Sequence, residues 1–106
     1  MAFTAQWTVT DKSDKTYESV AAFFTDSKAD EALVKQHTDI EIGIVLDKVN
    51  VLSEDGKSFI HSKTFEGKGN YDKWLEEKEK LPEIDEHLTY TPKAESITQD
   101  DGSVLV

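Results

Sequence analysis

The alternation of apolar and polar residues is clearest between positions 40 and 65, where it predicts a β-hairpin. Apolar residues recur through 40–52 and 58–65, and a Ser-Glu-Asp-Gly turn ending at Gly56 separates the two runs. Glycine supplies the positive φ that a tight turn needs, and β-branched and aromatic residues favour extended backbone. In the first run the apolar positions change parity after Asp47-Lys48, so we expect a β-bulge or bend there.

The same kind of pattern predicts the remaining elements. Residues 3–10 alternate between an apolar set that includes Trp7 and a polar set that includes Gln6, as in a strand with two unlike faces. Apolar residues three and four positions apart predict helical segments at 17–24, 29–36 and 70–81, and the final residues, 94–106, predict a second hairpin. Thr25-Asp26-Ser27 is the expected cap of the second helical segment, whose inward residues are Ala29, Ala32, Leu33 and Gln36. Asn70 is the expected cap of the third, Pro82 ends or kinks it, and a further helical turn is considered for residues 83–90. The predicted order is β-α-α-β-β-α-β-β in a single domain, residues 1–106, with helices on one side of an antiparallel sheet.

The net charge of the chain limits the kinds of molecule that it can bind. The chain has 22 acidic and 12 basic residues and a formal net charge of −10, which opposes approach to nucleic acid and to anionic membrane surfaces. It has no cysteine, no long apolar run and no basic leader followed by an apolar stretch, so we expect a cytoplasmic protein without disulfides. High acidity also allows a nucleic-acid mimic or an acidic module that binds a basic protein.

The stretch from Phe65 through Asn70-Tyr71-Asp72-Lys73-Trp74-Leu75, with Pro82 beyond it, resembles the third-strand-to-second-helix junction of the dimeric α+β barrel superfamily, which includes antibiotic biosynthesis monooxygenase-like proteins. The resemblance implies a ferredoxin-like α+β fold and a homodimer formed through the sheet, with Tyr71 and Trp74 packing the helix on that sheet. The broken helix pair before position 40 and the terminal Asp100-Asp101-Gly102 turn depart from the family's pattern.

The predicted hairpin also suggests that the sheet is covered on both sides. Gly43 and Val45 lie on the face opposite Ile42 and Ile44, and neither face of the returning strand is cleanly polar. Helices cover one side only. We therefore expect a second subunit on the other side and a pocket at the dimer sheet.

The candidate catalytic residue is His61, because an imidazole on a central strand beside Phe59 can move a proton near neutral pH. Trp7, Asn50, Tyr90 and Gln6 are the candidate ligand-binding residues, since small-molecule sites combine aromatic walls with a few polar groups. The alternatives are a hydrogen-bonded structural histidine at position 61 and a plain core role for Trp7.

No metal-ligand or phosphate-loop signature is present. His37 and His87, with Asp85 and Glu86, match no known ligand spacing. Active members of the resembled family oxidise or cyclise aromatic, polyketide-like substrates without metal or flavin, so the resemblance implies a cofactor-free protein of this kind with a small aromatic ligand. The alternative is a non-catalytic acidic interaction module or inhibitor, whose binding surface would be the negative patch of Glu76, Glu77, Glu79, Glu83, Asp85 and Glu86.

Overall fold

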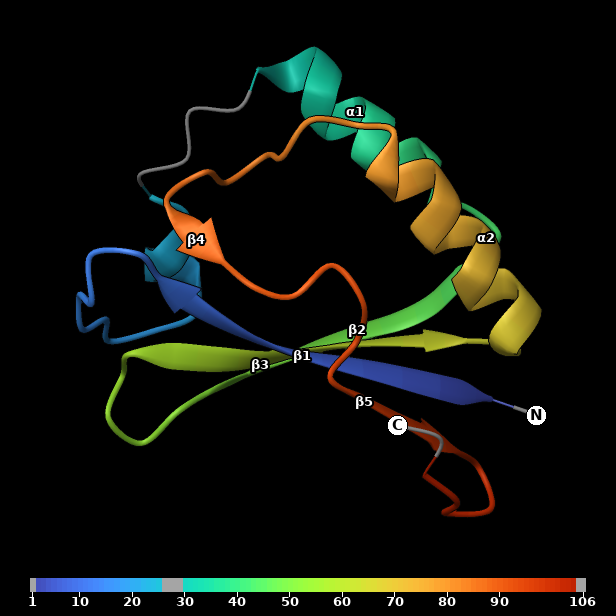
Figure 1. The fold of residues 1–106 in the computed structure, drawn as a ribbon. Helices are drawn as coiled ribbons and strands as arrows, with labels where there is room; N and C mark the ends of the chain where they lie inside the picture. Colours follow the sequence, from blue (N-terminus) through green and yellow to red (C-terminus); the bar gives the residue numbers. More distant parts are fainter. Residues whose placement is uncertain (1, 26–29, 105–106) are drawn as a thin grey trace.

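The computed structural model describes residues 2–25 and 30–104, and within them a five-stranded antiparallel sheet carries two α-helices on one face (Figure 1). The elements follow the chain as β1 (Phe3–Asp11), the 3-10 helix η1 (Ala21–Phe24), α1 (Glu31–Asp39), β2 (Val45–Leu52), β3 (Ser58–Phe65), α2 (Lys68–Glu79), β4 (Leu88–Thr89) and β5 (Ser96–Gln99). The predicted α+β class is confirmed, and the architecture is compatible with a ferredoxin-like fold.

Strand β1 lies at the centre of the sheet although it comes first in the chain. The spatial order is β2-β3-β1-β4, and β5 also pairs with β1. Phe3 pairs with Phe65 of β3 on one side and with Gln99 of β5 on the other. Thr10, near the other end of β1, pairs with Thr89 of β4. One edge of β1 is therefore filled by β3, and the other is shared by two short strands.

The apolar set of β1 forms the floor of the core, as its alternation predicts. Phe3 and Trp7 are buried, and α2 packs Tyr71 and Trp74 against them. The ring centroids of Phe3 and Tyr71 lie 5.5 Å apart, and those of Trp7 and Trp74 also lie 5.5 Å apart. Aromatic pairs at this separation add to the stability that burial of their area supplies. The predicted role of Tyr71 and Trp74 in holding the helix on the sheet is confirmed.

The start of the predicted hairpin differs from the structure. Residues 40–44 form turns after α1, and β2 begins only at Val45. Gly43 has a φ of +76°, a left-handed conformation that interrupts extended backbone. The pairing of β2 with β3 shifts between Val45 and Asp47, so the irregularity lies at Leu46, immediately before the predicted position. An irregularity is therefore present close to the predicted one. It does not keep the apolar residues on one face, because residues 40–44 precede the strand and Val49 and Val51 lie exposed on the face opposite Val45.

Helix α1 packs loosely. Asp30 caps it by accepting a hydrogen bond from the backbone N–H of Leu33 at 3.1 Å, and none of its residues is buried. Ala32 and Gln36, which were expected to face inward, are exposed. The predicted inward position of Ala29 and the predicted cap at Asp26-Ser27 lie outside the described residues. Of the earlier predicted segment at 17–24, only η1 is helical.

Helix α2 follows the prediction more closely. Its N-cap is Gly67 rather than Asn70, so it begins three residues earlier than expected, and it ends before Pro82. The helical turn considered for residues 83–90 is replaced by turns and the short strand β4. The predicted final hairpin is present as β5 and a single bridge between Thr98 and Val104, while residues 105–106 lie outside the described part.

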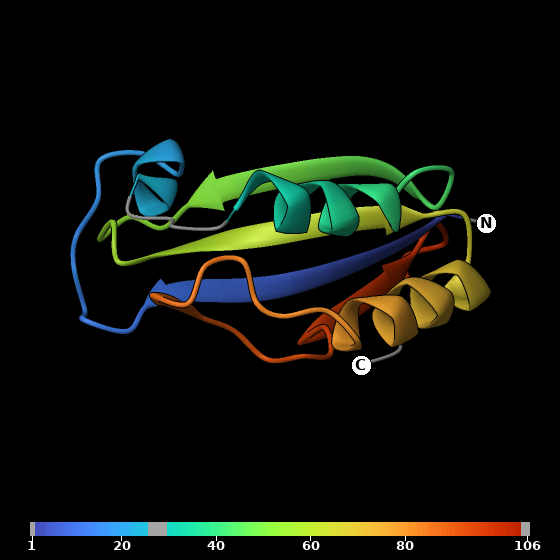
Figure 2. The same cartoon turned by 90° about the horizontal axis from the view of Figure 1, so that it is seen from above.

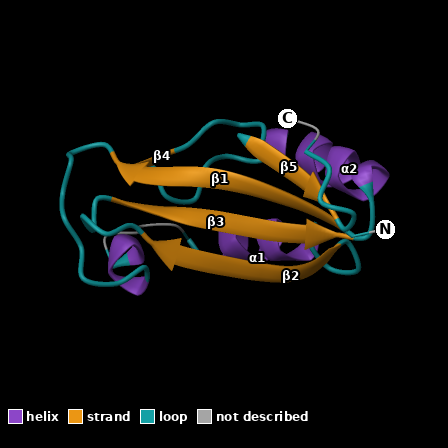
Figure 3. Ribbon diagram, turned by 90° about the horizontal axis from the view of Figure 1, so that it is seen from below, coloured by secondary structure: helices purple, strands orange, loops and turns teal. Residues whose placement is uncertain are grey.

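The two faces of the sheet differ. From above, α1 runs along the β2–β3 side and α2 along the β1–β5 side (Figure 2). The opposite face, called the open face below, carries no helix in the described part of the chain (Figure 3). Strand pairing places on the open face Thr4, Gln6, Thr8, Thr10, Asp47, Val49, Val51, Ser58, Ile60, Ser62, Thr64, Ser96 and Thr98. Among the described helices, none has the length and apolar character needed to cross a bilayer.

Candidate functional site

A cavity of about 180 Å³ lies between the sheet and the helix layer. Its floor comes from β1 and β3, one wall from α2, a second from α1 and the turn after it, and the third from the segment between α2 and β4. Helix α1 buries none of its own side chains and contributes only His37 to the lining. Most of the lining therefore comes from β1, β3, α2 and the segment that follows α2.

Aromatic side chains form much of the cavity's lining: Trp7, Phe24, Phe59, Trp74 and Tyr90. An engineered apolar cavity of ~150 Å³ takes up benzene, so this one has room for a single substituted aromatic ring. Titratable residues complete the lining: His37, Glu41, His61, Lys63, Lys78 and Asp85. Apolar walls with a few convergent polar groups are the usual composition of a small-molecule site.

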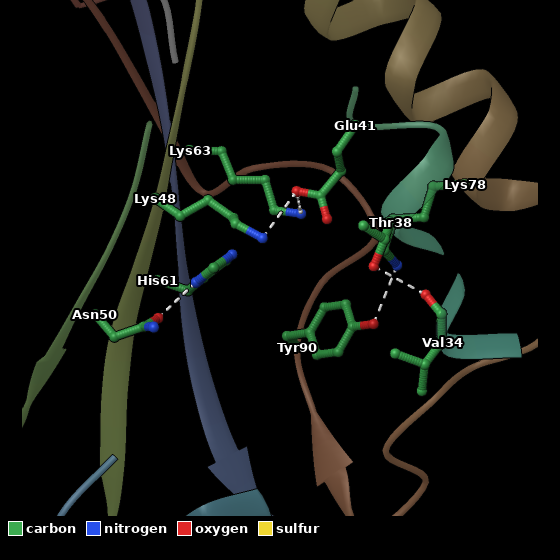
Figure 4. A network of polar contacts seen from close by, with 9 residues as sticks. All are labelled: Val34, Thr38, Glu41, Lys48, Asn50, His61, Lys63, Lys78 and Tyr90. Carbon is green, nitrogen blue, oxygen red and sulfur yellow. Dashed lines mark hydrogen bonds and ion pairs between the residues drawn. The ribbon is translucent and has the colours of Figure 1, made fainter. Parts of the chain in front are cut away.

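His61 lies on the cavity floor and is held from behind by Asn50. Its Nδ1 is 2.5 Å from Asn50 Oδ1, an acceptor, so Nδ1 carries the proton and donates it, and Nε2 keeps its lone pair. Figure 4 shows Nε2 on the side of the ring away from Asn50. Burial and then the charge of Lys63 lower the pKa of His61 to about 4, so the imidazole is neutral at pH 7.

Lys63 lies two residues further along β3 on the same face and is 9% exposed. Its Nζ is 4.4 Å from the centre of the Trp74 ring and 3.3 Å from Glu41 Oε2. The same oxygen is 3.4 Å from Lys48 Nζ, so two ammonium groups share one carboxylate (Figure 4). Burial lowers the pKa of Lys63 to about 8, although Glu41 opposes the shift.

A second polar group lies on the opposite wall. Lys78 of α2 donates a hydrogen bond to Tyr90 Oη at 3.0 Å and lies 4.9 Å from the centre of that ring. Tyr90 in turn donates a hydrogen bond to Glu83. Burial, followed by the bond to Glu83, raises the pKa of Tyr90. The phenol therefore stays protonated across the physiological range.

The structure brings together most of the residues predicted from the sequence. His61, Trp7 and Tyr90 all line the cavity. Asn50 does not line it but orients His61. Gln6 lies on the open face, where its side chain donates a hydrogen bond to Ser62 Oγ at 3.2 Å. The cavity lies within one chain, on the helix side of the sheet, whereas the sequence pattern predicted a pocket at the dimer sheet.

Glu41, Lys63 and Lys78 were missed as site residues. The sequence contains a signal for Lys63, because it alternates with Phe59, His61 and Phe65 on one face of a strand. A charged side chain on such a face is unexpected unless it has a partner or a function. Lys78 falls on the same helical stripe as Trp74. Nothing in the sequence marks Glu41 as a site residue. It reaches the cavity because residues 40–44 form turns, whereas the sequence predicts a strand there.

The other features singled out in the sequence have structural partners. His37 Nε2 contacts the carbonyl of Pro82 at 2.8 Å, and His87 Nε2 contacts the carbonyl of Phe23 at 2.6 Å. Within the described ranges, no three His, Asp or Glu side chains gather as metal ligands. Two members of the acidic patch are engaged inside the chain, Glu77 with Lys80 and Glu83 with Tyr90. The acidic interaction module therefore stays a prediction without a specific structural observation in its favour.

Comparison of the chain with protein-family models, with curated proteins and with solved structures finds no match in any of the three. The cavity is therefore the feature of this chain that points to a function.

Proposed function

We propose that this chain binds a small aromatic molecule in the cavity and acts on it without a cofactor, as a monooxygenase- or cyclase-like protein in which His61 accepts a proton. The observation that carries the proposal is a neutral imidazole, oriented by Asn50, on the floor of an aromatic-lined cavity. Neutral imidazole with a lone pair on Nε2 is the form of histidine that can act as a general base. A pKa of about 4 makes His61 a weak base, so net proton transfer to it depends on groups that stabilise the anion left behind.

The surrounding groups suit an acidic phenol or enol. Removing a proton from such a ligand leaves an anion, which the nearby ammonium groups of Lys63 and Lys78 would stabilise. The electron-rich anion is the species that both ring closure and reaction with dioxygen require. The rings of Trp7 and Trp74 would hold the ligand flat over the floor.

The test uses 4-nitrophenol, which is coloured only when deprotonated. Both tryptophans of the chain line the cavity, so ligand entry should quench their fluorescence in a saturable way. Bound nitrophenol should also show a lower apparent pKa than free nitrophenol. His61→Ala should retain the quenching and lower the apparent pKa further, because a neutral imidazole accepts a hydrogen bond from the phenol and so favours its protonated form.

Ser62→Ala is the matched control, because Ser62 is the next residue on β3 and faces the open side. It should behave as the unchanged protein does. Quenching that does not saturate, or an equal shift in the His61→Ala variant, would contradict the proposal.

We also propose that a second copy of the chain packs on the open face. Among the strand residues of that face in the described part, only Asp47 is charged, and Glu95, just before β5, adds a carboxylate that accepts a hydrogen bond from Thr8 Oγ1 at 3.0 Å. This is little charge for a chain in which 32% of residues are charged. Two chains of charge −10 repel each other least where their surfaces carry the least charge. Exposed Val49, Val51 and Ile60 supply apolar area on the same face.

A further inference from the structure

Lys63 is the least expected group in the cavity. Lysine is almost never buried without a reason, because its ammonium group loses hydration. Here the side chain reaches between Trp74 and Glu41 and lines the cavity, so its accessible surface faces the space where a ligand would lie. Lys48 contacts the same carboxylate oxygen from a more exposed position and already balances the charge of Glu41. Charge balance alone therefore does not account for a buried lysine at position 63.

We propose that Lys63 is a nucleophilic amine that forms an imine with an aldehyde or ketone bound in the cavity, with Glu41 transferring the protons. The inference depends on the proposed function in one respect, that the cavity takes up an aromatic ligand. It adds a substrate class, aromatic carbonyl compounds, and a covalent step that His61 alone does not supply.

The step is balanced within the site. Glu41 takes a proton from the Lys63 ammonium group, and the Nζ lone pair then attacks the carbonyl carbon, forming a C–N bond as the C=O π bond opens to an alkoxide. A second Nζ proton passes to that oxygen and gives the carbinolamine hydroxyl. Glu41 returns the first proton to this hydroxyl, which leaves as water as the C=N bond forms. The ammonium group and the carbonyl become a protonated imine and water without any change in oxidation state, and the 3.3 Å contact between Nζ and Oε2 is the path for the proton that Glu41 carries.

Desolvation supports this chemistry. An amine attacks only in its neutral form, and a lysine desolvated among apolar groups reaches that form more readily. The lowered pKa of Lys63, about 8, gives it a far larger neutral fraction at pH 7.5 than a lysine of ordinary pKa. Lys68, with its side chain 64% exposed at the start of α2, is the natural reference on the same chain.

The experiment traps the imine in the full chain. The protein is incubated with benzaldehyde and sodium cyanoborohydride at pH 7.5, which adds hydride to the imine carbon and leaves a benzyl group on the amine. Peptide mass mapping then compares the rate of benzylation at Lys63 with that at Lys68, and separates both from the α-amino group. We expect Lys63 to react at least tenfold faster than Lys68, and excess benzyl alcohol, which fits the cavity but has no carbonyl, to slow Lys63 alone.

Two variants separate the nucleophile from a structural ion pair. Lys63→Arg keeps the positive charge over Trp74 and beside Glu41 but cannot form an imine, so it should retain benzyl alcohol binding and lose the fast adduct. Glu41→Gln should slow trapping severalfold if Glu41 transfers protons. A faster reaction in that variant would show that Glu41 only holds the amine protonated, and would overturn its assigned role.

The outcomes distinguish the two proposals. If benzyl alcohol quenches the tryptophan fluorescence but Lys63 reacts no faster than Lys68, the imine is overturned and the cavity remains a ligand site. If neither binding nor preferential trapping is observed, both proposals fail. Fast trapping at Lys63 that benzyl alcohol suppresses supports both.

Discussion

At the scale of single residues, β3 holds two titratable side chains whose charged forms are disfavoured by burial. His61 and Lys63 face the same cavity, and each has a pKa well below its ordinary value, chiefly because of burial. Two such groups side by side in a cavity are typical of functional sites, since a core built for stability alone would use apolar residues there.

The burial of His61 predicts a dependence of stability on pH. The unfolded chain binds a proton at this imidazole below about pH 6.5, whereas the folded chain does so only near its lowered pKa of about 4. Between these values the unfolded state holds more protons, so the free energy of unfolding should fall as the pH falls, by up to about 1.4 kcal/mol per pH unit. Urea denaturation at pH 7, 6 and 5 measures this slope.

His61→Gln is the comparison for this slope, because its amide can still donate to Asn50 but does not titrate. The variant should lose less stability than the unchanged chain between pH 6.5 and 4. Equal losses in both proteins would show that His61 is not the group responsible. Asp11 adds a separate effect at lower pH, since hydrogen bonds from Ser13 and Tyr17 lower its pKa to about 2 and it protonates first in the unfolded chain.

The sequence could identify His61 because an imidazole is unusual beside Phe59 on a central strand, and it could suggest Trp7 and Tyr90 as aromatic walls of a pocket. It could not show which face of each strand lies under the helices and which faces away from them. Gln6 and His61 were both treated as pocket residues, although the pairing of Trp7 with His61 puts Gln6 on the opposite face. Which face the helices cover is a tertiary choice that alternation alone does not encode.

At the scale of elements, the turn between β2 and β3 also anchors the segment that follows β1. Gly56 has a φ of +69°, and its carbonyl accepts a hydrogen bond from the backbone N–H of Tyr17 at 2.8 Å. A Cβ at this position would lie 2.5 Å from the Tyr17 carbonyl oxygen, which cannot yield without moving the backbone. The glycine is required both for the turn and for the close approach of the two segments.

Gly56→Ala should therefore destabilise the protein by more than the left-handed conformation alone costs, which is about 1–2 kcal/mol. Gly43→Ala is the matched control, because Gly43 has a similar φ of +76° and a Cβ there would meet no atom within 4 Å. Thermal denaturation of both variants gives the difference. A loss no greater for Gly56→Ala than for Gly43→Ala would mean that the contact with Tyr17 contributes little.

The contrast between the two α-helices shows what local pattern can predict. Tyr71 and Trp74 mark the buried side of α2 clearly, and both are buried. Helix α1 has no comparable pair. Of the residues predicted to face inward, Leu33 is half-buried, whereas Ala32 and Gln36 are exposed. A helix that covers a cavity instead of filling a core leaves a weak periodic signal, because few of its positions need to be apolar.

At the scale of the whole molecule, the open face is the surface on which self-association can be tested. Sedimentation equilibrium over a range of concentrations should give the mass of a dimer. Val49→Lys, on the open face, should shift the equilibrium towards monomer, because it places two like charges in the proposed interface.

Val34→Lys on α1 is the control. Val34 and Val49 are similarly exposed, at 42% and 49%, but lie on opposite sides of the sheet. The control should remain a dimer. A single species with the mass of one chain at every concentration, or equal weakening by both substitutions, would contradict the proposed dimer.

The central place of β1 has a consequence for how this chain folds. Its neighbours are contributed by the middle of the chain and by its last described strand, so that Phe3 is paired with both Phe65 and Gln99. Pairings between residues so distant in sequence form slowly, because the loops between them must close first. During synthesis β1 emerges early yet stays an unpaired, partly apolar strand until β3 arrives, and one of its edges remains largely open until β5 follows. The central strand of the sheet is therefore the first to be synthesised and among the last to have both of its edges paired.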